Sequence, residues 1–321
     1  MKAAIYTKYG PPEVVSVVEI DNPQPGSKEV LIKIHACTVN RTDSGFRSAE
    51  YFVSRFWSGL FKPRTKVLGN EFAGEIAAVG GEVTRFRIGD RVFGYDDSRF
   101  GAHAEYKVIA ESGTLYAMPE HLAYHDVVPS TEGAHYALSN IRAAKVKAGD
   151  HVLVNGATGA IGSAAVQLLR YFGAHVTAVC ATPHIELVKQ LGAEVVIDYL
   201  TDDFTRTDRK FDFIFDAVGK STFGRCRPLL KKKGIYVSTE LGKNGENIPL
   251  ALITPIFGGR KVIFPIPKFS IDDMRFLQEL VSSGDFKPVI DRYFPLDQIV
   301  AAYRYVETGQ KIGNVVIKLI G

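Results

Sequence analysis

Two hydrophobic patterns alternate along the middle of the chain: short runs of apolar residues, and longer segments in which apolar residues recur at helical spacing. The apolar runs lie at residues 152–154, 175–180, 194–198, 211–216 and 235–238. Helical spacing continues after the first run to Leu169 and returns at residues 188–191, where Gly192 ends it. Strands that alternate with helices in this way predict an α/β domain with a parallel, doubly wound sheet.

Three evenly spaced glycines join the first of these strands to its helix. Gly156, Gly159 and Gly162 follow the apolar run and precede an alanine-rich helical segment. Glycine lets the backbone approach a ligand closely, and the free N–H groups and positive dipole end of a helix start attract phosphate. The order of strand, glycine turn, helix and second strand predicts a site for the pyrophosphate of a dinucleotide. The alternative is a glycine-containing turn that binds nothing.

The residues before this region have a different pattern. Short apolar alternations, cut by Gly, Pro and Asp, lie at residues 29–37, 74–79, 90–93 and 103–109. This pattern is typical of an irregular β domain, and residues 313–320 also predict a strand. Because the α/β region lies in the middle of the chain, we expect the last residues to return to the first domain. We place the domains at residues 1–122, 123–265 and 266–321.

Length and composition fit a protein of about two domains without an obvious polymeric partner. The chain has 321 residues and a net charge of +4, without a long basic block, so neither nucleic acid nor a membrane surface is indicated. The polar start and the lack of an apolar segment of ~20 residues favour a cytoplasmic location. Cys37, Cys180 and Cys226 are far apart in the sequence, which disfavours a disulfide framework and a cysteine-rich zinc site.

Several motifs, in their order along the chain, resemble the medium-chain dehydrogenase/reductase superfamily. They are residues 1–5, 29–34, 68–75 and 89–94, the glycine turn, and residues 191–193 followed by 196–199. The resemblance runs from end to end and implies a Rossmann doubly wound parallel sheet plus a GroES-like irregular β-barrel domain. Within the superfamily the chain looks like the zinc-independent quinone oxidoreductase branch, including the reticulon-interacting oxidoreductase-like members.

The zinc-ligand positions of the superfamily are altered in this chain. Zinc-dependent members have cysteine where this chain has Asn40, histidine where it has Asn70, and a second cysteine close to Glu132. Amides are poor zinc ligands and a lone carboxylate does not hold the metal, so we expect no metal. Without a Lewis acid, hydride transfer from NADPH to a quinone or an α,β-unsaturated carbonyl is favoured. The alternatives are an NAD(P)-dependent alcohol dehydrogenase and a nucleotide-sensing regulatory protein with little turnover.

The end of the second strand of the α/β region bears on the choice between NAD and NADP. An acid there would bind the ribose 2′-OH of NAD, but residues 180–184 contain none and the first acid is Glu186. The resemblance implies that His184 replaces a phosphate-contacting lysine and that Tyr199 keeps an aromatic contact. We therefore expect NADP(H). Thr182 either contacts the phosphate or caps the following helix.

The resemblance also implies the remaining site residues. Asn40, Asp43 and His135 are expected near the nicotinamide as catalytic residues, with structural hydrogen bonds as the alternative for each. The expected cofactor contacts come from the glycine turn, the strand ends and the C-terminal part of the chain: Gly156, Thr158, Gly159, Ala160, Ile161, Gly162, Thr182, His184, Tyr199, Asp216, Gly219, Leu241, Phe264, Gln310, Lys311 and Ile312.

Aromatic residues crowd into residues 51–61, a segment that we interpret as a lid over an apolar substrate. Tyr51, Phe56 and Trp57 are its candidate substrate-binding residues, with ordinary packing and contact with a membrane surface as alternatives.

The apolar run at residues 261–267 predicts an exposed edge of the parallel sheet. The resemblance implies that this edge pairs with its copy in a homodimer. The alternative is that Pro265 and Pro267 blunt the edge of a monomer.

Overall fold

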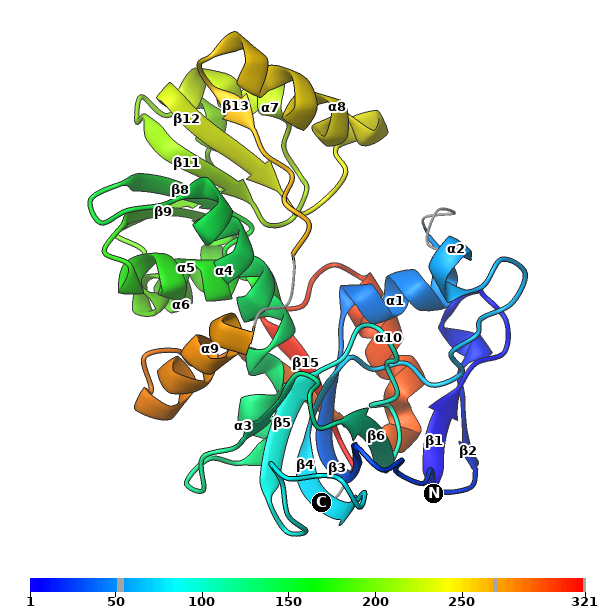
Figure 1. Cartoon of the computed structure of the whole chain (residues 1–321). Coiled ribbons are helices and arrows are strands. Elements are labelled where there is room, and N and C mark those ends of the chain that lie inside the picture. The colour runs from blue at the N-terminus through cyan, green and yellow to red at the C-terminus, as the bar shows by residue number, and fades with distance from the viewer. Residues whose placement is uncertain (51–54, 268–270, 320–321) are drawn as a thin grey trace. The chain divides into compact units, whose positions relative to one another are not determined.

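The computed structural model describes residues 1–50, 55–267 and 271–319. They form two compact units, which are coloured along the chain in Figure 1. One unit comprises Met1–Glu132, Met274–Ser282 and Pro288–Gly321, and the other comprises Gly133–Asp273 and Ser283–Lys287. The main divisions therefore lie after Glu132 and Asp273, whereas the sequence-based division was made at residues 122 and 265.

The second unit is built on a six-stranded parallel sheet with the order β10-β9-β8-β11-β12-β13. Its strands are β8 (His151–Asn155), β9 (His175–Cys180), β10 (Val195–Asp198), β11 (Phe211–Asp216), β12 (Leu230–Ser238) and β13 (Lys261–Val262). Val152, Leu153 and Val154 are fully buried, as expected for a strand covered on both faces. This strand order is that of the dinucleotide-binding Rossmann fold, so the predicted doubly wound sheet is confirmed.

Helices connect and flank these strands (Figure 1). They are α4 (Glu132–Ala144), α5 (Ala160–Tyr171), α6 (Ile185–Leu191), α7 (Phe223–Cys226) and α8 (Asn247–Ile253). The helix α5 follows β8 directly after the glycine turn, and its buried residues include Ala164, Ala165 and Leu168. Small residues on the buried face let the helix lie close to the sheet.

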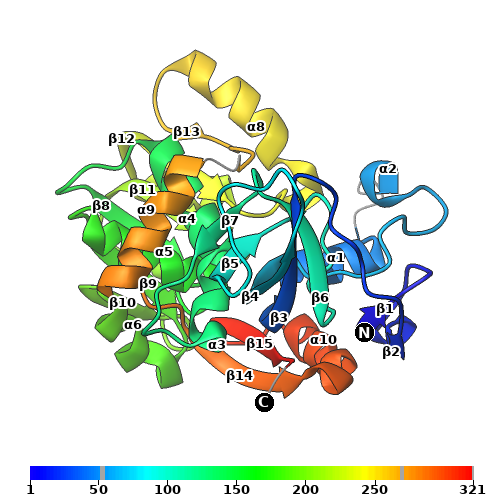
Figure 2. The ribbon, with the colours of Figure 1, turned by 60° about the horizontal axis from the view of Figure 1, so that its bottom comes forward.

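The first unit contains a separate β1–β2 hairpin and a seven-stranded sheet with the order β14-β15-β3-β4-β5-β7, in which β6 pairs with β3 (Figure 2). The strands are β1 (Lys2–Ile5), β2 (Ser16–Glu19), β3 (Glu29–Val39), β4 (Glu71–Val79), β5 (Arg91–Tyr95), β6 (Tyr106–Ala110), β7 (Leu115–Ala117), β14 (Ile290–Pro295) and β15 (Asn314–Lys318). The register between β3 and β4 shifts twice, and such bulges bend a sheet. The GroES-like irregular β domain is thereby confirmed.

The C-terminal strand β15 pairs with β3, which brings the end of the chain into the first unit. Its core includes Ile32, Phe72, Ile76 and Tyr303, all nearly or fully buried. The helices that lie wholly or mostly in this unit are α1 (Arg41–Ser48), α2 (Arg55–Ser58), α3 (Tyr124–Val127), α9 (Ile271–Ser283) and α10 (Ile299–Glu307). Over the described ranges, no helix has both the length and the apolar character that crossing a membrane requires.

Candidate active site

At two positions of the turn between β8 and α5, the backbone conformation and close packing require glycine. Gly156 has a φ of +81°, and a Cβ atom on it would lie 2.6 Å from Cβ of Val218. A Cβ atom on Gly162 would lie 2.0 Å from the carbonyl oxygen of Gly156. Both positions exclude a larger side chain for reasons internal to the fold.

Gly159 differs from the other two glycines of the turn. A Cβ atom on it would meet only the Gly156 carbonyl oxygen, at an ordinary contact distance of 3.7 Å. Gly159 is the N-cap of α5 and makes no side-chain cap hydrogen bond, so the first N–H groups of this helix are not capped in that way. Thr158, Ala160 and Ile161 belong to the same turn. The space beside Gly159 and the uncapped helix start fit a phosphate group of a dinucleotide.

Asp216, at the end of β11, is fully buried and holds the loop that follows it. Its carboxylate accepts hydrogen bonds from the Asn155 side chain at 2.9 Å and from the Ser221 backbone N–H at 2.8 Å. Gly219, in the same loop, has a φ of +64°. Asp216 therefore stabilises the conformation of the loop that carries Gly219.

The end of β10, which lies opposite the end of β9, carries a carboxylate that sequence reasoning missed. The Thr182 hydroxyl donates to Oδ2 of Asp198 at 2.5 Å, and the Leu200 N–H donates to Oδ1 at 2.9 Å. These bonds hold the pKa of Asp198 below its usual value. The cap of α6 is His184, without a side-chain cap bond, so Thr182 does not cap that helix. The missed signal is the parallel register, which places Asp198 opposite Cys180.

The other predicted cofactor residues are divided between the two units. Tyr199 is exposed beyond β10, Leu241 follows β12 and Phe264 follows β13, all in the parallel-sheet unit. Gln310, Lys311 and Ile312 precede β15 in the first unit, where the Lys311 ammonium donates to the Gly313 carbonyl.

Asn40 and Asp43 fix the start of α1 through a capping box. Oδ1 of Asn40 accepts the Asp43 N–H at 2.9 Å, and Oδ2 of Asp43 accepts the Asn40 N–H at 3.2 Å. Two polar side chains three residues apart are the sequence signature of such a cap. Oδ1 of Asp43 also accepts the Gly69 N–H at 2.9 Å, which ties the helix start to the segment before β4. Asp43 is fully buried and acts here as a positioning residue.

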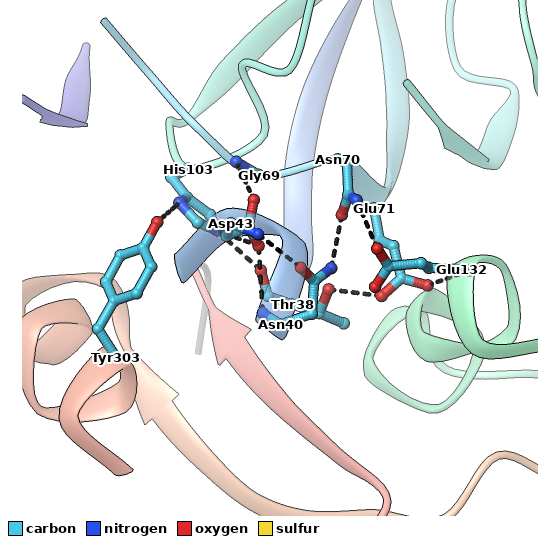
Figure 3. Close-up of polar contacts among 9 residues, drawn as sticks. All are labelled: Thr38, Asn40, Asp43, Gly69, Asn70, Glu71, His103, Glu132 and Tyr303. Atoms are coloured by element: carbon cyan, nitrogen blue, oxygen red, sulfur yellow. Dashed lines mark hydrogen bonds and ion pairs between the residues drawn. The ribbon is translucent and has the colours of Figure 1, made fainter. Parts of the chain in front are cut away.

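A directed chain of side-chain hydrogen bonds runs from Asn40 to Glu132 (Figure 3). Nδ2 of Asn40 donates to Oδ1 of Asn70 at 2.7 Å, and Nδ2 of Asn70 donates to Oε1 of Glu132 at 3.0 Å. All three residues are at most 8% exposed. The chain fixes the orientation of both amides.

Glu71 lies beside this chain and collects several donors. The hydroxyls of Thr38 and Thr131 donate to its two oxygens at 2.6 and 2.7 Å, and the Glu132 N–H donates at 2.7 Å. Burial raises the pKa of Glu71, and these hydrogen bonds oppose the rise. Burial and the charge of Glu71 raise the pKa of Glu132 to about 8.

His103 and Tyr303 complete the cluster in Figure 3, and sequence reasoning missed both. Nε2 of His103 lies 2.8 Å from the Thr38 carbonyl oxygen, and Nδ1 lies 3.3 Å from the Tyr303 hydroxyl. Burial lowers the pKa of His103 to about 4, so the ring is neutral near pH 7. Its 3.7 Å separation from Asp43 is therefore not an ion pair at that pH.

Comparisons with known proteins agree with this arrangement. Residues 26–120 match the alcohol dehydrogenase GroES-like domain, and residues 191–317 match the zinc-binding dehydrogenase model. A 2-methylene-furan-3-one reductase of Solanum lycopersicum is 31% identical, over 99% of this chain and 79% of that protein. A chloroplast quinone oxidoreductase of Triphysaria versicolor is 30% identical, over 99% and 98% of the two chains. The chain belongs to the medium-chain dehydrogenase/reductase superfamily.

Within this superfamily, the chain belongs to the quinone oxidoreductase-like branch. The solved structure of the quinone oxidoreductase from Coxiella burnetii has a TM-score of 0.90 at 29% identity, and the match covers 100% of this chain and 99% of that one. The predicted resemblance is thus confirmed at the level of superfamily and branch.

The zinc of dehydrogenases in this superfamily does not fit the residues present here. The oxygen atoms of Asn40 and Asn70 are the atoms of these side chains that a metal would bind, and both already accept hydrogen bonds. Over the residues that the structure describes, no group of three or more His, Cys, Asp or Glu residues could hold a metal ion. No step of the reaction is therefore derived through zinc.

The remaining predicted site residues of this dehydrogenase/reductase are His135, Tyr51, Phe56 and Trp57. His135 lies in α4, in the parallel-sheet unit, and burial lowers its pKa to about 4. Phe56 in α2 is 63% exposed. Tyr51 and the side chain of Trp57 lie outside the described residues. The roles of these residues stay predictions.

Proposed function

We propose that this protein is a metal-free, NADPH-dependent oxidoreductase that reduces quinones or α,β-unsaturated carbonyls. The observation that carries the proposal is the hydrogen-bond chain from Asn40 through Asn70 to Glu132, which occupies the positions of the zinc ligands. Without the metal, an alcohol substrate lacks its Lewis acid, whereas an electron-poor substrate needs less polarisation. The names of the two plant relatives, a furanone reductase and a quinone oxidoreductase, support the same substrate class.

The cofactor would be held by the glycine turn and the start of α5. When bound, the reduced nicotinamide supplies a hydride. Gly159 and the first N–H groups of α5 bind the pyrophosphate, because the turn leaves space there and the helix dipole favours negative charge. Leu241 and Phe264 are the proposed contacts of this unit toward the nicotinamide and ribose, and the cofactor contacts expected of Gln310, Lys311 and Ile312 stay predictions.

The preference for NADP(H) is proposed from the end of β9. Residues 180–184 contain no carboxylate, and His184 and Tyr199 offer an imidazole and an aromatic ring to the 2′-phosphate. The Asp198 carboxylate nearby is engaged by Thr182 and by the Leu200 N–H. Hydrogen bonds of this kind reduce its repulsion of a phosphate but do not remove its charge.

Asn40 would orient the substrate carbonyl. Its Nδ2 group is fixed by the bond to Asn70, and its Oδ1 atom is fixed by the cap of α1. A fixed amide donor beside an oxygen that gains charge stabilises that charge without reorganisation. His135 is neutral near pH 7 and is proposed to contact the substrate or the nicotinamide by hydrogen bonding.

The decisive experiment follows the loss of NADPH absorbance with a panel of quinones and enones, and the reverse reaction with simple alcohols and NADP⁺. We expect reduction of at least one class of electron-poor substrate, unchanged after treatment with a chelator. Alcohol oxidation abolished by the chelator would contradict the proposal in favour of a zinc alcohol dehydrogenase. Tight NADPH binding with no turnover of any substrate would favour a nucleotide-sensing role.

We also propose a homodimer formed through the edge of the parallel sheet. β13 lies at this edge and pairs with β12 on one side. Ile256 and Phe257, just before β13 in the sequence, are 78% and 80% exposed. Large apolar side chains so exposed beside a sheet edge are typical of an interface.

A further inference from the structure

We propose that the first unit has a second ligand site, a cavity beside β3 that binds a small organic carboxylate with a flat apolar body. The cavity has a volume of about 360 Å³, at the small end of the range for small-molecule sites. None of the residues that line it is among the predicted catalytic, cofactor-binding or substrate-binding residues. Those that carry the argument are His35, Ala36, Arg91, Tyr124 and Lys318, all in this unit.

An irregularity in β3 brings two successive residues to the cavity. Ile34 and Cys37 both belong to the core cluster, although residues three apart on a regular strand point to opposite faces. The register between β3 and β4 shifts between Ile34 and Ala36, which is where the alternation breaks. As a result His35 and Ala36 both line the cavity. Bulges that redirect a side chain in this way are common beside functional sites.

His35 offers the cavity a buried polar atom. Its ring stacks on the ring of Tyr124, with the centroids 4.2 Å apart and an interplanar angle of 27°. Burial and the positive charges of Lys33 and Arg91 lower the pKa of His35, so the ring is neutral near pH 7. In the described part of the chain, its buried Nε2 atom has no hydrogen-bond partner. Buried polar atoms are nearly always paired, so the partner of this one comes from outside the chain.

Lys318 supplies a positive charge that is available to a ligand. Its Nζ atom lies 4.2 Å from the centroid of the Tyr293 ring, and the face of an aromatic ring stabilises a cation. Among the residues that the structure describes, neither a carboxylate nor a carbonyl pairs with this ammonium group, which has three N–H donors. Lys318 lies directly opposite Ala36 in the pairing of β15 with β3, so its side chain and His35 line one cavity.

Arg91 adds a second charge, in a fixed position. Its Nη1 and Nη2 atoms donate to the carbonyls of Glu120 and Leu122 at 2.5 and 2.6 Å. The guanidinium carbon lies 4.6 Å from the centroid of the Tyr124 ring, the same ring on which His35 stacks. The bonds to the carbonyls leave the guanidinium charge in place, because a carbonyl does not neutralise it. Arg91 therefore attracts an anion, and Lys318 and His35 bind it.

The charges around the cavity favour a ligand with a single negative charge. Glu75 lies opposite Arg91 in the pairing of β4 with β5, and Oδ1 of Asp126 lies 3.6 Å from Nε2 of His125. Three cations and two carboxylates therefore surround the cavity, which leaves one positive charge in excess: Lys33, Arg91, Lys318, Glu75 and Asp126. A carboxylate matches this excess, whereas a phosphate monoester carries close to two negative charges.

The neutral part of the ligand is indicated by the rest of the lining. Ala36, Ala123 and the ring of Tyr124 give the cavity apolar surface beside its charged groups. A flat ring or conjugated chain that carries one carboxylate fits both kinds of surface. Benzoate and naphthoate are therefore suitable probes, and benzyl alcohol and inorganic phosphate are their controls.

The first test is calorimetric titration of the full chain with these four compounds. We expect one molecule of each aromatic carboxylate to bind per chain, with both controls at least about tenfold weaker, because each control lacks either the single charge or the ring. Saturation with NADPH should leave these affinities unchanged. No binding of either carboxylate, equal binding of a control, or displacement by NADPH would overturn the proposal.

The second test uses variants of the two proposed contacts. Lys318→Gln removes the charge, and His35→Phe keeps a ring to stack on Tyr124 but removes both ring nitrogens. Each should weaken naphthoate binding by about tenfold or more, the effect of a hydrogen bond to a charged group. Lys8→Gln, at an exposed position of the same unit, is the matched control and should bind as the wild type does. Wild-type affinity in both variants, with unfolding temperatures that show them folded, would overturn the assignment.

The third test needs no variant. Acetic anhydride should acetylate Lys318 and Lys8 of the wild type, and mass spectrometry of the digested protein follows each site. Saturating naphthoate should slow the modification of Lys318 and leave that of Lys8 unchanged. An unchanged rate at Lys318 would place the bound acid elsewhere and overturn the proposal. Because the cavity shares no residue with the proposed active site, the reductase function stands or fails independently of all three tests.

Discussion

The Thr182 hydroxyl donates a 2.5 Å hydrogen bond to the carboxylate of Asp198, at the edge of the parallel sheet where β9 and β10 end. The Asp198 carboxylate places a negative charge beside the residues that we expect to select between NADH and NADPH. The sequence segment that follows β9 contains no acid, so this charge comes from the neighbouring strand. We therefore expect residues of two strands to determine the selectivity of the proposed site.

The first prediction is that Asp198→Asn shifts the preference further toward NADPH. Asparagine keeps an oxygen for Thr182 but removes the charge that repels a 2′-phosphate. We expect the ratio of NADPH to NADH affinity to rise about fivefold, because a like-charge repulsion is removed. Titrations with both dinucleotides measure it.

The control for this change is Glu194→Gln, which removes a carboxylate just before the opposite end of β10, where Glu194 contacts His175 at 2.9 Å. It should leave the ratio unchanged. Equal changes in both affinities of Asp198→Asn would show that Asp198 only supports the local fold.

The second prediction separates the glycines of the turn. Gly159→Ala adds a Cβ atom that meets only a 3.7 Å contact within the protein, so the free energy of unfolding should change by less than about 1 kcal/mol. The new methyl group enters the space proposed for the pyrophosphate, so dinucleotide binding should be lost. Thermal unfolding and fluorescence titration with NADPH measure the two effects.

Gly162→Ala is the matched comparison. Its Cβ atom would lie 2.0 Å from the Gly156 carbonyl, which forces the turn to move and should cost about 3 kcal/mol of stability. A folded Gly159→Ala variant that binds NADPH as the wild type does would refute the proposed site.

Much of the fold follows from local sequence patterns, because buried parallel strands consist of consecutive apolar residues. The predicted apolar run at residues 211–216 has the same bounds as strand β11 in the structure. The predicted run at 235–238 covers only the end of β12, which begins at Leu230. Three lysines, at positions 231–233, interrupt the apolar pattern in that strand. A search for apolar runs therefore does not detect the first half of β12.

The candidate site was harder to predict because its partners are far apart in the sequence. Glu71 and the backbone of Glu132 are 61 residues apart, and His103 and Tyr303 are 200 apart. The sequence shows a carboxylate at the start of an apolar strand, which is a signal of a buried charge, but it does not show what pairs with it. Asn40 and Asp43, by contrast, are three residues apart, and their capping box is a local signature.

The third prediction concerns His103 and the stability of the protein in acid. Its pKa is about 4 in the folded chain and ~6.5 when unfolded, so between these values the unfolded chain binds more protons. The contribution of a neutral His103 is thus present above pH ~6.5 and is lost as pH falls toward 4. One group with this shift contributes at most about 3 kcal/mol.

His103→Gln tests this prediction, because glutamine keeps an N–H donor for the Thr38 carbonyl but does not titrate. Denaturant unfolding between pH 4 and 7 should show a weaker pH dependence than in the wild type. His121→Gln, at an exposed position, serves as the control and should match the wild type. A variant His103→Gln with the full wild-type pH dependence would mean that other groups account for the acid sensitivity.

The last prediction concerns assembly through β13. This strand has β12 on one side only and follows the exposed Ile256 and Phe257, so a second copy that pairs with the edge would extend the sheet and cover these side chains. Light scattering at micromolar concentration should give about twice the mass of one 35.3 kDa chain. Ile263→Lys, directly after β13, should release monomers, because it places an unpaired charge in the interface. The control Ile88→Lys changes an isoleucine of the first unit that is 67% exposed, and it should leave the dimer intact. A wild-type mass near that of a single chain would refute the dimer, and it would indicate that Pro265 and Pro267 protect the edge of a monomer.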